Sequence, residues 1–331
     1  MQNKMIKNLV MVLLAALILA ACGPAATPAP SPVDSLTTEK QESKPTLKVL
    51  AVQTFLADIA QNVAGERVKV ASLIPIGLDP HAFEPTPQDV RKIAESNVLI
   101  LNGSGFEEWI EKTLENAGGE RLVIEASAGL AMREPGDNEP SREDAHEGEG
   151  EEHVHEGDPH FWFDPTLVVK YVENIRDGLV AADPEGKDTY AANAAAYIAE
   201  LNELDAWIKA QVEPIPAERR LMVTDHHTFG YFADRYGFTI IGAIVPSFST
   251  GASPSAQELA GLINQVKDTG APAIFLESSS SPQLARQVAS ETGAKVVTDL
   301  YTHSITEPGG KAPTYIDMMR HNVTRIVEAL K

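Results

Sequence analysis

The sequence has little cysteine and few positive charges. Its 331 residues contain one cysteine, Cys22, which excludes an intramolecular disulfide. There are 27 lysines and arginines against 47 aspartates and glutamates, so the formal net charge is −20. This balance argues against nucleic acid or an anionic lipid surface as a partner, and it suits the capture of cations. The remaining composition, 43% hydrophobic and 22% charged, is that of a globular protein.

The apolar run at the start of the chain is short. Leu9–Ala21 has 13 residues, fewer than a membrane span needs, and is typical of a signal peptide. The run ends in Leu-Ala-Ala-Cys, which resembles a bacterial lipobox. We therefore expect residues 1–21 to be removed and Cys22 to be lipidated, which would anchor the protein to the membrane outside the cytoplasm. Residues 22–46, rich in Pro, Ala, Ser and Thr, predict a flexible tether.

Short apolar segments alternate with helical patterns in residues 47–183 and again in 217–331. This alternation predicts an α/β fold of two lobes, each with a four-stranded, mostly parallel sheet flanked by helices. Between them, residues 184–216 carry a helical pattern of about 28 residues, or about 42 Å at 1.5 Å per residue. We expect one long rigid helix that joins the lobes.

Local signals predict several element boundaries. Val68–Ile74 reads as a strand. Thr86 followed by Pro87 predicts a helix start, since threonine caps helices and proline suits the first helical position. Ser281 followed by Pro282 predicts another capped helix.

An acidic segment, residues 133–158, breaks the alternating pattern. It contains eleven aspartates or glutamates and three histidines, with almost nothing apolar. This composition predicts a disordered loop. The loop is either a solvated insertion without a role or a weak collector of cations through His146, His153 and His155.

Four other histidines follow predicted strands or stiff loops. His81 and His160 lie in near-duplicate motifs, Asp-Pro-His followed by an aromatic residue and then acid-Pro, and proline stiffens both segments. His226 and His303 follow two strands of the second half. Ligand sites in open parallel sheets form beyond the carboxyl ends of strands, so these four could surround one metal ion between the lobes. The alternative is that each is a hydrogen-bonded structural histidine. His227 competes with His226, because only one of two neighbours in an extended chain can face the cleft.

These motifs resemble those of the metal-binding lipoproteins of ABC importers, the zinc/manganese group that includes the zinc-uptake periplasmic proteins. The resemblance covers residues 47–331. Gly77–Pro87, Asp158–Pro165 and Thr224–Phe232 match the first three ligand loops of that family, and Leu300–Ile305 matches the fourth, where the family usually has aspartate. The resemblance implies His81, His160 and His226 as ligands, with His303 as the fourth and Asp299 as the alternative.

The function implied is a monomeric, extracytoplasmic protein that binds Zn²⁺ and delivers it to a membrane permease, without catalysis. Mn²⁺ is the alternative ion, since an oxygen ligand suits manganese whereas four nitrogens favour zinc. Two further functions remain open at this point: a surface adhesin with a structural metal, and a zinc hydrolase. The hydrolase lacks support, because no His-Glu-x-x-His motif occurs and four protein ligands leave no position for water.

Overall fold

Two separate parallel sheets make up the framework of the computed structural model, which describes residues 47–133, 136 and 157–331. The first sheet has the order β2-β1-β3-β4, and the second has the order β6-β5-β7-β8. All neighbouring strands run parallel. The strands are β1 (Val49–Ala51), β2 (Val70–Ser72), β3 (Val98–Leu101), β4 (Leu122–Glu125), β5 (Leu221–Thr224), β6 (Thr239–Ala243), β7 (Ala273–Glu277) and β8 (Lys295–Leu300). The predicted pair of four-stranded sheets is confirmed.

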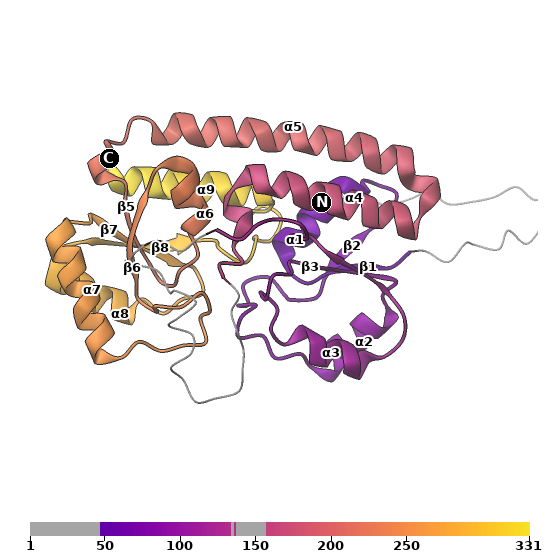
Figure 1. The fold of residues 1–331 in the computed structure, drawn as a ribbon, viewed down its shortest axis with the longest axis horizontal. Helices are drawn as coiled ribbons and strands as arrows, with labels where there is room; N and C mark the ends of the chain where they lie inside the picture. Colours follow the sequence, from indigo (N-terminus) through magenta and orange to yellow (C-terminus); the bar gives the residue numbers. More distant parts are fainter. Residues whose placement is uncertain (1–46, 134–135, 137–156) are drawn as a thin grey trace, which may run out of the picture. The chain divides into compact units, whose positions relative to one another are not determined.

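Helices flank both sheets, as predicted (Figure 1). Those of the first half are α1 (Thr54–Ala64), α2 (Pro87–Glu95), α3 (Ile110–Ala117) and α4 (Pro165–Ala182). The long helix α5 (Lys187–Val212) follows, and the second half has α6 (Gly230–Tyr236), α7 (Ala256–Thr269), α8 (Gln283–Thr292) and α9 (Tyr315–Leu330). Short 3-10 segments connect several of them, including Phe161–Phe163 before α4.

Successive strand residues face opposite layers of helices. In β1, Val49 and Ala51 join a core with α1, α4 and α5, whereas Leu50 joins a smaller core with α2 and α3. In the second sheet, Val223 packs with α7 and α8, and its neighbour Met222 packs in the larger core. This alternation follows from the two-residue period of a strand. The central strands of each sheet are therefore buried on both faces.

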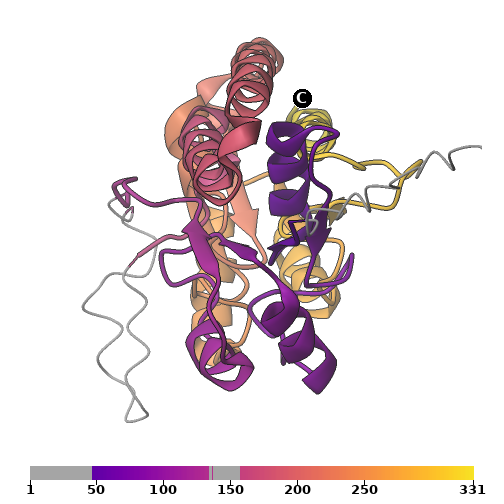
Figure 2. The same ribbon diagram turned by 90° about the vertical axis from the view of Figure 1, so that its right-hand side faces the viewer.

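Helix α5 links the two halves and has 26 residues, close to the predicted length. It packs against α1 and α4 of the first half and against α6 and α9 of the second. Figure 1 shows α5 extending over both sheets, and Figure 2 shows it beside α4, with α1 beside α9. The largest apolar core draws residues from both halves, so Pro45–Lys331 forms one compact unit.

Two of the three predicted boundaries need correction. Thr86 caps α2 as predicted, because its hydroxyl accepts from Asp89 N and the Asp89 carboxylate accepts from Thr86 N. The helix predicted at Ser281 begins after Pro282 without a side-chain cap. Strand β2 is shorter than the predicted segment 68–74. The N–H groups of the two residues that follow β2 still donate to backbone carbonyls, one at the end of β1 and one in the residue after β1.

Several predictions concern residues outside the described part of the chain. These are the signal peptide, Cys22, the tether and the histidines of the acidic segment, His146, His153 and His155. The two ends of that segment are described, and there the prediction of disorder does not hold. Arg133 forms ion pairs with Asp158 and Asp234, which fix both ends of the segment against α6.

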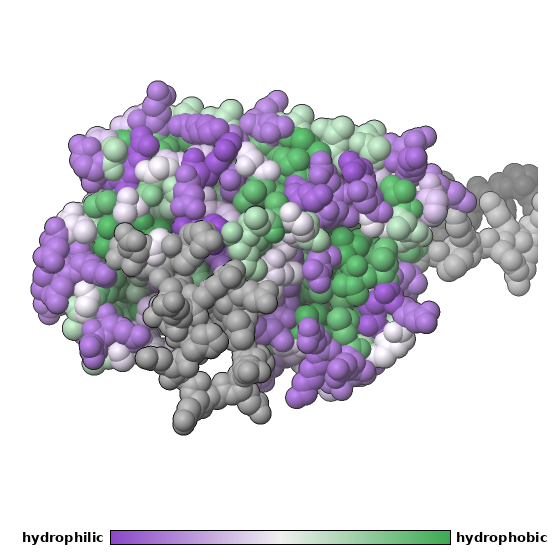
Figure 3. Space-filling view, viewed as in Figure 1, coloured by the Kyte–Doolittle hydropathy of each residue, from purple (hydrophilic) through white to green (hydrophobic). Residues whose placement is uncertain are grey.

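The described surface mixes hydrophilic and hydrophobic residues on the face shown in Figure 3. Among the residues that the structure describes, the exposed large hydrophobic side chains are Ile76, Leu78, Leu122 and Val123. None of the described helices has both the length and the apolar character of a membrane span.

Candidate metal centre

The four predicted histidines meet in one cluster between the two halves. His81 lies in the loop after β2, and His160 directly precedes the 3-10 segment Phe161–Phe163. His226 and His303 follow β5 and β8 by two and three residues, respectively. His160 and His226 are fully buried and His303 is 4% exposed, whereas His81 is partly exposed. Each half of the chain therefore contributes two imidazoles.

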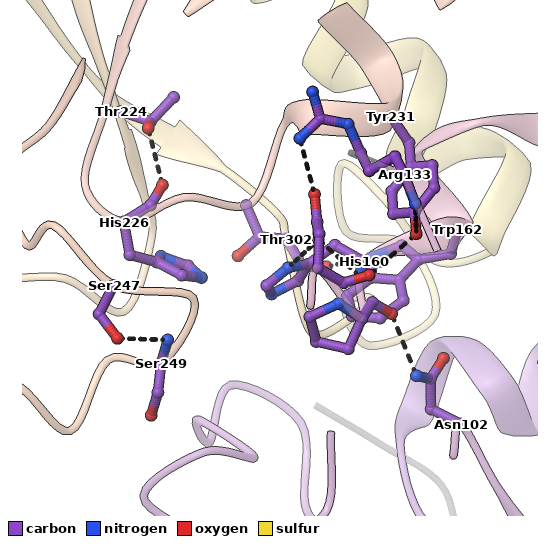
Figure 4. Close-up of polar contacts among 12 residues, drawn as sticks. Asn102, Arg133, His160, Trp162, Thr224, His226, Tyr231, Ser247, Ser249 and Thr302 are labelled. Carbon is purple, nitrogen blue, oxygen red and sulfur yellow. Dashed lines mark hydrogen bonds and ion pairs between the residues drawn. The ribbon is translucent and has the colours of Figure 1, made fainter. Parts of the chain in front are cut away.

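The rings are packed at nearly equal separations. All six distances between ring centroids lie between 5.0 and 5.6 Å. One nitrogen from each ring lies within 4.8 Å of the others. Figure 4 shows His160 and His226 pointing toward each other. Six similar separations describe a tetrahedron, the geometry that zinc takes with four protein ligands.

The donor set fits a divalent ion. Zinc bonds to imidazole nitrogens at 2.0–2.1 Å, which places the four nitrogens of a tetrahedral site about 3.4 Å apart, inside the 4.8 Å limit. Nε2 of His226 and Nε2 of His303 are buried and make no hydrogen bond with the described residues. A buried polar atom without a partner is costly, and a metal ion would satisfy both.

Carboxylates stand behind three of the imidazoles. Asp158 Oδ1 lies 2.9 Å from His160 Nδ1, and Glu277 Oε2 lies 3.0 Å from His303 Nδ1. Asp225 Oδ1 is 3.3 Å from His226 Nδ1. A carboxylate on one ring nitrogen fixes the orientation of the ring and leaves the other nitrogen to bind the metal. Neither Asp225 nor Glu277 was predicted from the sequence; the only signal for Glu277 is an acid at the end of the apolar strand β7.

Burial and these acids set the charges of the cluster. Burial lowers the pKa of the His226 imidazole, but the neighbouring carboxylates of Asp225 and Glu277 outweigh it and raise the pKa overall. Burial also lowers the pKa of His227 to about 3, helped by the positive charge of His226. His227 lies outside the cluster, near Phe248, and its N–H donates to Ser247 O. Of the two neighbours, only His226 therefore reaches the site.

Two aromatic side chains wall the cluster on the side of the first half. The ring of Phe106 lies 4.7 Å from that of His81, and the ring of Trp162 lies 5.1 Å from that of His160. Both are almost fully buried. The Trp162 indole donates to Thr302 O, beside His303, and thereby connects the two halves. A wall of this kind excludes water and lowers the local dielectric constant, which strengthens charge interactions in the site.

Asp299, the alternative fourth ligand, lies elsewhere. It belongs to β8 and forms ion pairs with Arg325 at 2.9 Å and Lys311 at 3.3 Å. It does not belong to the histidine cluster. Because two cations already contact its carboxylate oxygens, the half-buried Asp299 is held beside α9.

Comparison with known proteins shows the family of the chain. The family model described as "Zinc-uptake complex component A periplasmic" matches residues 49–329. The manganese-binding lipoprotein MntA of Halalkalibacterium halodurans is 35% identical over 320 residues, 96% of each chain. The manganese ABC transporter substrate-binding lipoprotein PsaA of Streptococcus pneumoniae is 30% identical over 300 residues, 88% of this chain and 92% of the relative.

Solved structures share the fold. The periplasmic zinc-binding protein TroA of Treponema pallidum aligns with a TM-score of 0.75 at 28% identity, over 86% of this chain and 99% of its own. A manganese-bound periplasmic metal-binding protein of Candidatus Liberibacter asiaticus aligns at 0.73 and 30% identity, over 86% and 100%. The chain belongs to the zinc-uptake complex component A family, whose members are extracytoplasmic metal-binding components of ABC transporters and not enzymes.

Proposed function

We propose that this protein binds Zn²⁺ outside the cytoplasm through His81, His160, His226 and His303 and delivers it to a membrane permease. The observation that carries the proposal is the set of four imidazole nitrogens within 4.8 Å of one another. Imidazole is a ligand of borderline softness that suits zinc, and four of them complete its tetrahedral shell.

Manganese is the second candidate. The relatives MntA and PsaA are named for manganese, and one similar solved structure is manganese-bound. Manganese favours oxygen ligands, and carboxylate oxygens of Asp225 and Glu277 lie within 4.8 Å of a nitrogen of His226. The cluster of four nitrogens favours zinc, because its carboxylates contact the Nδ1 atoms of the imidazoles and leave the Nε2 atoms to the ion.

His303 is the fourth ligand in this proposal, in preference to Asp299. Its ring is 5.1 Å from that of His226 and 5.0 Å from that of His81. Asp299 is paired with Arg325 and Lys311, so its use as a ligand would break two ion pairs.

Metal analysis of protein purified without added metal, followed by competitive zinc and manganese titrations, tests the proposal. We expect zinc to bind more tightly than manganese. His303→Ala should weaken zinc binding and leave the fold intact, because water can take the vacant position. His303→Asp should retain binding and shift the preference toward manganese, since a harder oxygen replaces nitrogen. Parental zinc affinity in His303→Ala, together with loss of binding in Asp299→Ala, would make Asp299 the ligand.

Membrane attachment through a lipid on Cys22, a monomeric state and weak cation collection by His146, His153 and His155 complete the proposal. The lipobox and the lipoprotein names of the relatives support the anchor. Cys22→Ala should move the protein from the membrane fraction to the soluble fraction; a variant that remains membrane-bound and lipid-labelled would disprove the anchor.

A further inference from the structure

Arg133 lies between two acids from different parts of the chain. Its guanidinium forms a fork with Asp234 of α6, Nε–Oδ2 at 2.8 Å and Nη2–Oδ1 at 3.1 Å. Its Nη1 lies 3.6 Å from Asp158 Oδ2. The side chain of Arg133 is 8% exposed and that of Asp158 is 1% exposed, whereas that of Asp234 is 58% exposed. Arg133 therefore joins a surface acid to a deeply buried one.

Asp158 is the acid behind a predicted ligand. Its Oδ1 accepts from the backbone N–H of His160 at 3.0 Å and contacts His160 Nδ1 at 2.9 Å. Tyr231, also on α6, donates its hydroxyl to Asp158 O, and the same hydroxyl accepts from Arg133 N. Figure 4 shows Arg133 and Tyr231 grouped on one side of His160. The segment that orients His160 is thus attached to α6 through both its backbone and its side chain.

Gly230, the first residue of α6, leaves the space that the ion pair fills. A Cβ atom at this position would lie 2.4 Å from Arg133 Nη1 and 2.5 Å from Asp158 Oδ2. Both distances are below any tolerable contact, and neither atom is the loose end of an exposed chain. Arg133 and Asp158 therefore pack directly on the bare backbone at the start of α6.

We propose that Arg133 is a positioning residue for the metal site, which holds Asp158 and the His160 loop in register with α6 of the other half. The proposal rests on the proposed function, since it concerns the same ion. A buried carboxylate is strongly destabilised when its cation is removed, and ligands held by such outer partners lose affinity when the partner is lost. In this proposal Arg133 acts on His160 through Asp158.

Four variants and one control test this role. Arg133→Met removes the cation, and Arg133→Lys keeps the charge without the fork. Gly230→Ala keeps both charges and pushes them apart, while Asp234→Asn alters only the exposed partner. Arg67→Gln is the control, because Arg67 forms the same kind of fork with Asp183, at the end of α4 opposite to His160. For each, we would measure zinc affinity by chelator competition, the zinc dissociation rate, the absorption spectrum of bound Co²⁺ and the thermal midpoint.

We expect zinc affinity to fall about 10- to 100-fold in Arg133→Met and Gly230→Ala, with faster dissociation and an altered Co²⁺ spectrum. Arg133→Lys should recover part of the affinity, and Asp234→Asn should change it less than Arg133→Met. The control should lower the thermal midpoint without a change in affinity or spectrum. Parental affinity, rate and spectrum in both Gly230→Ala and Arg133→Lys would overturn the proposal, even if Arg133→Met failed to fold. Failure of the parent to bind zinc or manganese would instead reject the proposed function.

Discussion

Glu277 offers the sharpest test of how the cluster is built. Its side chain is 4% exposed and accepts from His303 Nδ1 at 3.0 Å and from the Thr302 hydroxyl, with the Ser280 hydroxyl 3.3 Å away. Glu277→Gln keeps an acceptor oxygen and the shape but removes the charge. Hydrogen bonds to an ionised group are about twice as strong as neutral ones, so the loss should be about 1.4 kcal/mol, or tenfold in zinc affinity.

Glu277→Leu is the stronger perturbation. It leaves His303 Nδ1 and the Thr302 hydroxyl buried without this acceptor, at about 1–3 kcal/mol for each group. We expect a loss of about 100-fold in zinc affinity and a lower thermal midpoint of the metal-free protein.

The matched control is Glu107→Gln. Glu107 is also 4% exposed, and its carboxylate accepts from Gln53 Nε2 and from two backbone N–H groups instead of a histidine. Zinc affinity, measured by competition with a chelator at fixed pH, should change less in this control than in Glu277→Gln, because the donors to Glu107 are an amide and backbone N–H groups and not an imidazole. The reasoning would be refuted if Glu277→Gln and Glu107→Gln had the same effect on affinity.

Two further predictions concern the contact between the halves and the response to pH. The Thr250 hydroxyl donates to Asp79 Oδ2 beside His81. Loss of this hydrogen bond in Thr250→Val should cost about 1.5 kcal/mol and make zinc release about tenfold faster in stopped-flow chelation, whereas Thr250→Ser should match the parent. Equal rates in both variants would contradict this. Burial raises the pKa of Asp58 from 3.8 to about 6, so the folded state binds this proton more tightly than the unfolded state does. Protonation of Asp58 therefore stabilises the fold by about 3 kcal/mol, a contribution that is full below pH 4 and lost by about pH 6. Asp58→Asn should flatten this part of the denaturation profile of the metal-free protein, and exposed Asp188→Asn should not; an unchanged slope in Asp58→Asn would refute the assignment.

The sequence predicted those features of the fold that depend on local pattern. Apolar segments of strand length alternating with helical periodicity placed all eight strands, and the threonine and proline at residues 86 and 87 placed the start of α2. The duplicated Asp-Pro-His motif also has a local outcome, since Asp79 and Asp158 both accept from the N–H of the histidine two residues later. The helix cap predicted at Ser281 was wrong, because α8 begins one residue later, after Pro282, without a side-chain cap.

Features that depend on pairing between distant segments were not predictable. Asp79 and Asp158 occupy the same place in their motifs, yet Asp79 binds Thr250 and Asp158 faces Arg133. Glu277 reaches His303 across 26 residues, because parallel strands β7 and β8 bring their carboxyl ends together. Nothing in the local sequence of these residues indicates their partners, which are set by the register of the sheets and the packing of α6.

The division of the four imidazoles between the two halves has a consequence for the transport cycle. An ion in the proposed site is chelated by four donors only while both halves are in register. A small separation would split one tetradentate site into two bidentate ones, each of which lacks the effective concentration that the second pair of ligands supplies. Since metal–nitrogen bonds are only 2.0–2.1 Å long, a displacement shorter than one bond length is enough. Retention and discharge of the ion then differ by a slight separation of the two histidine pairs, and the long helix α5 can remain intact throughout.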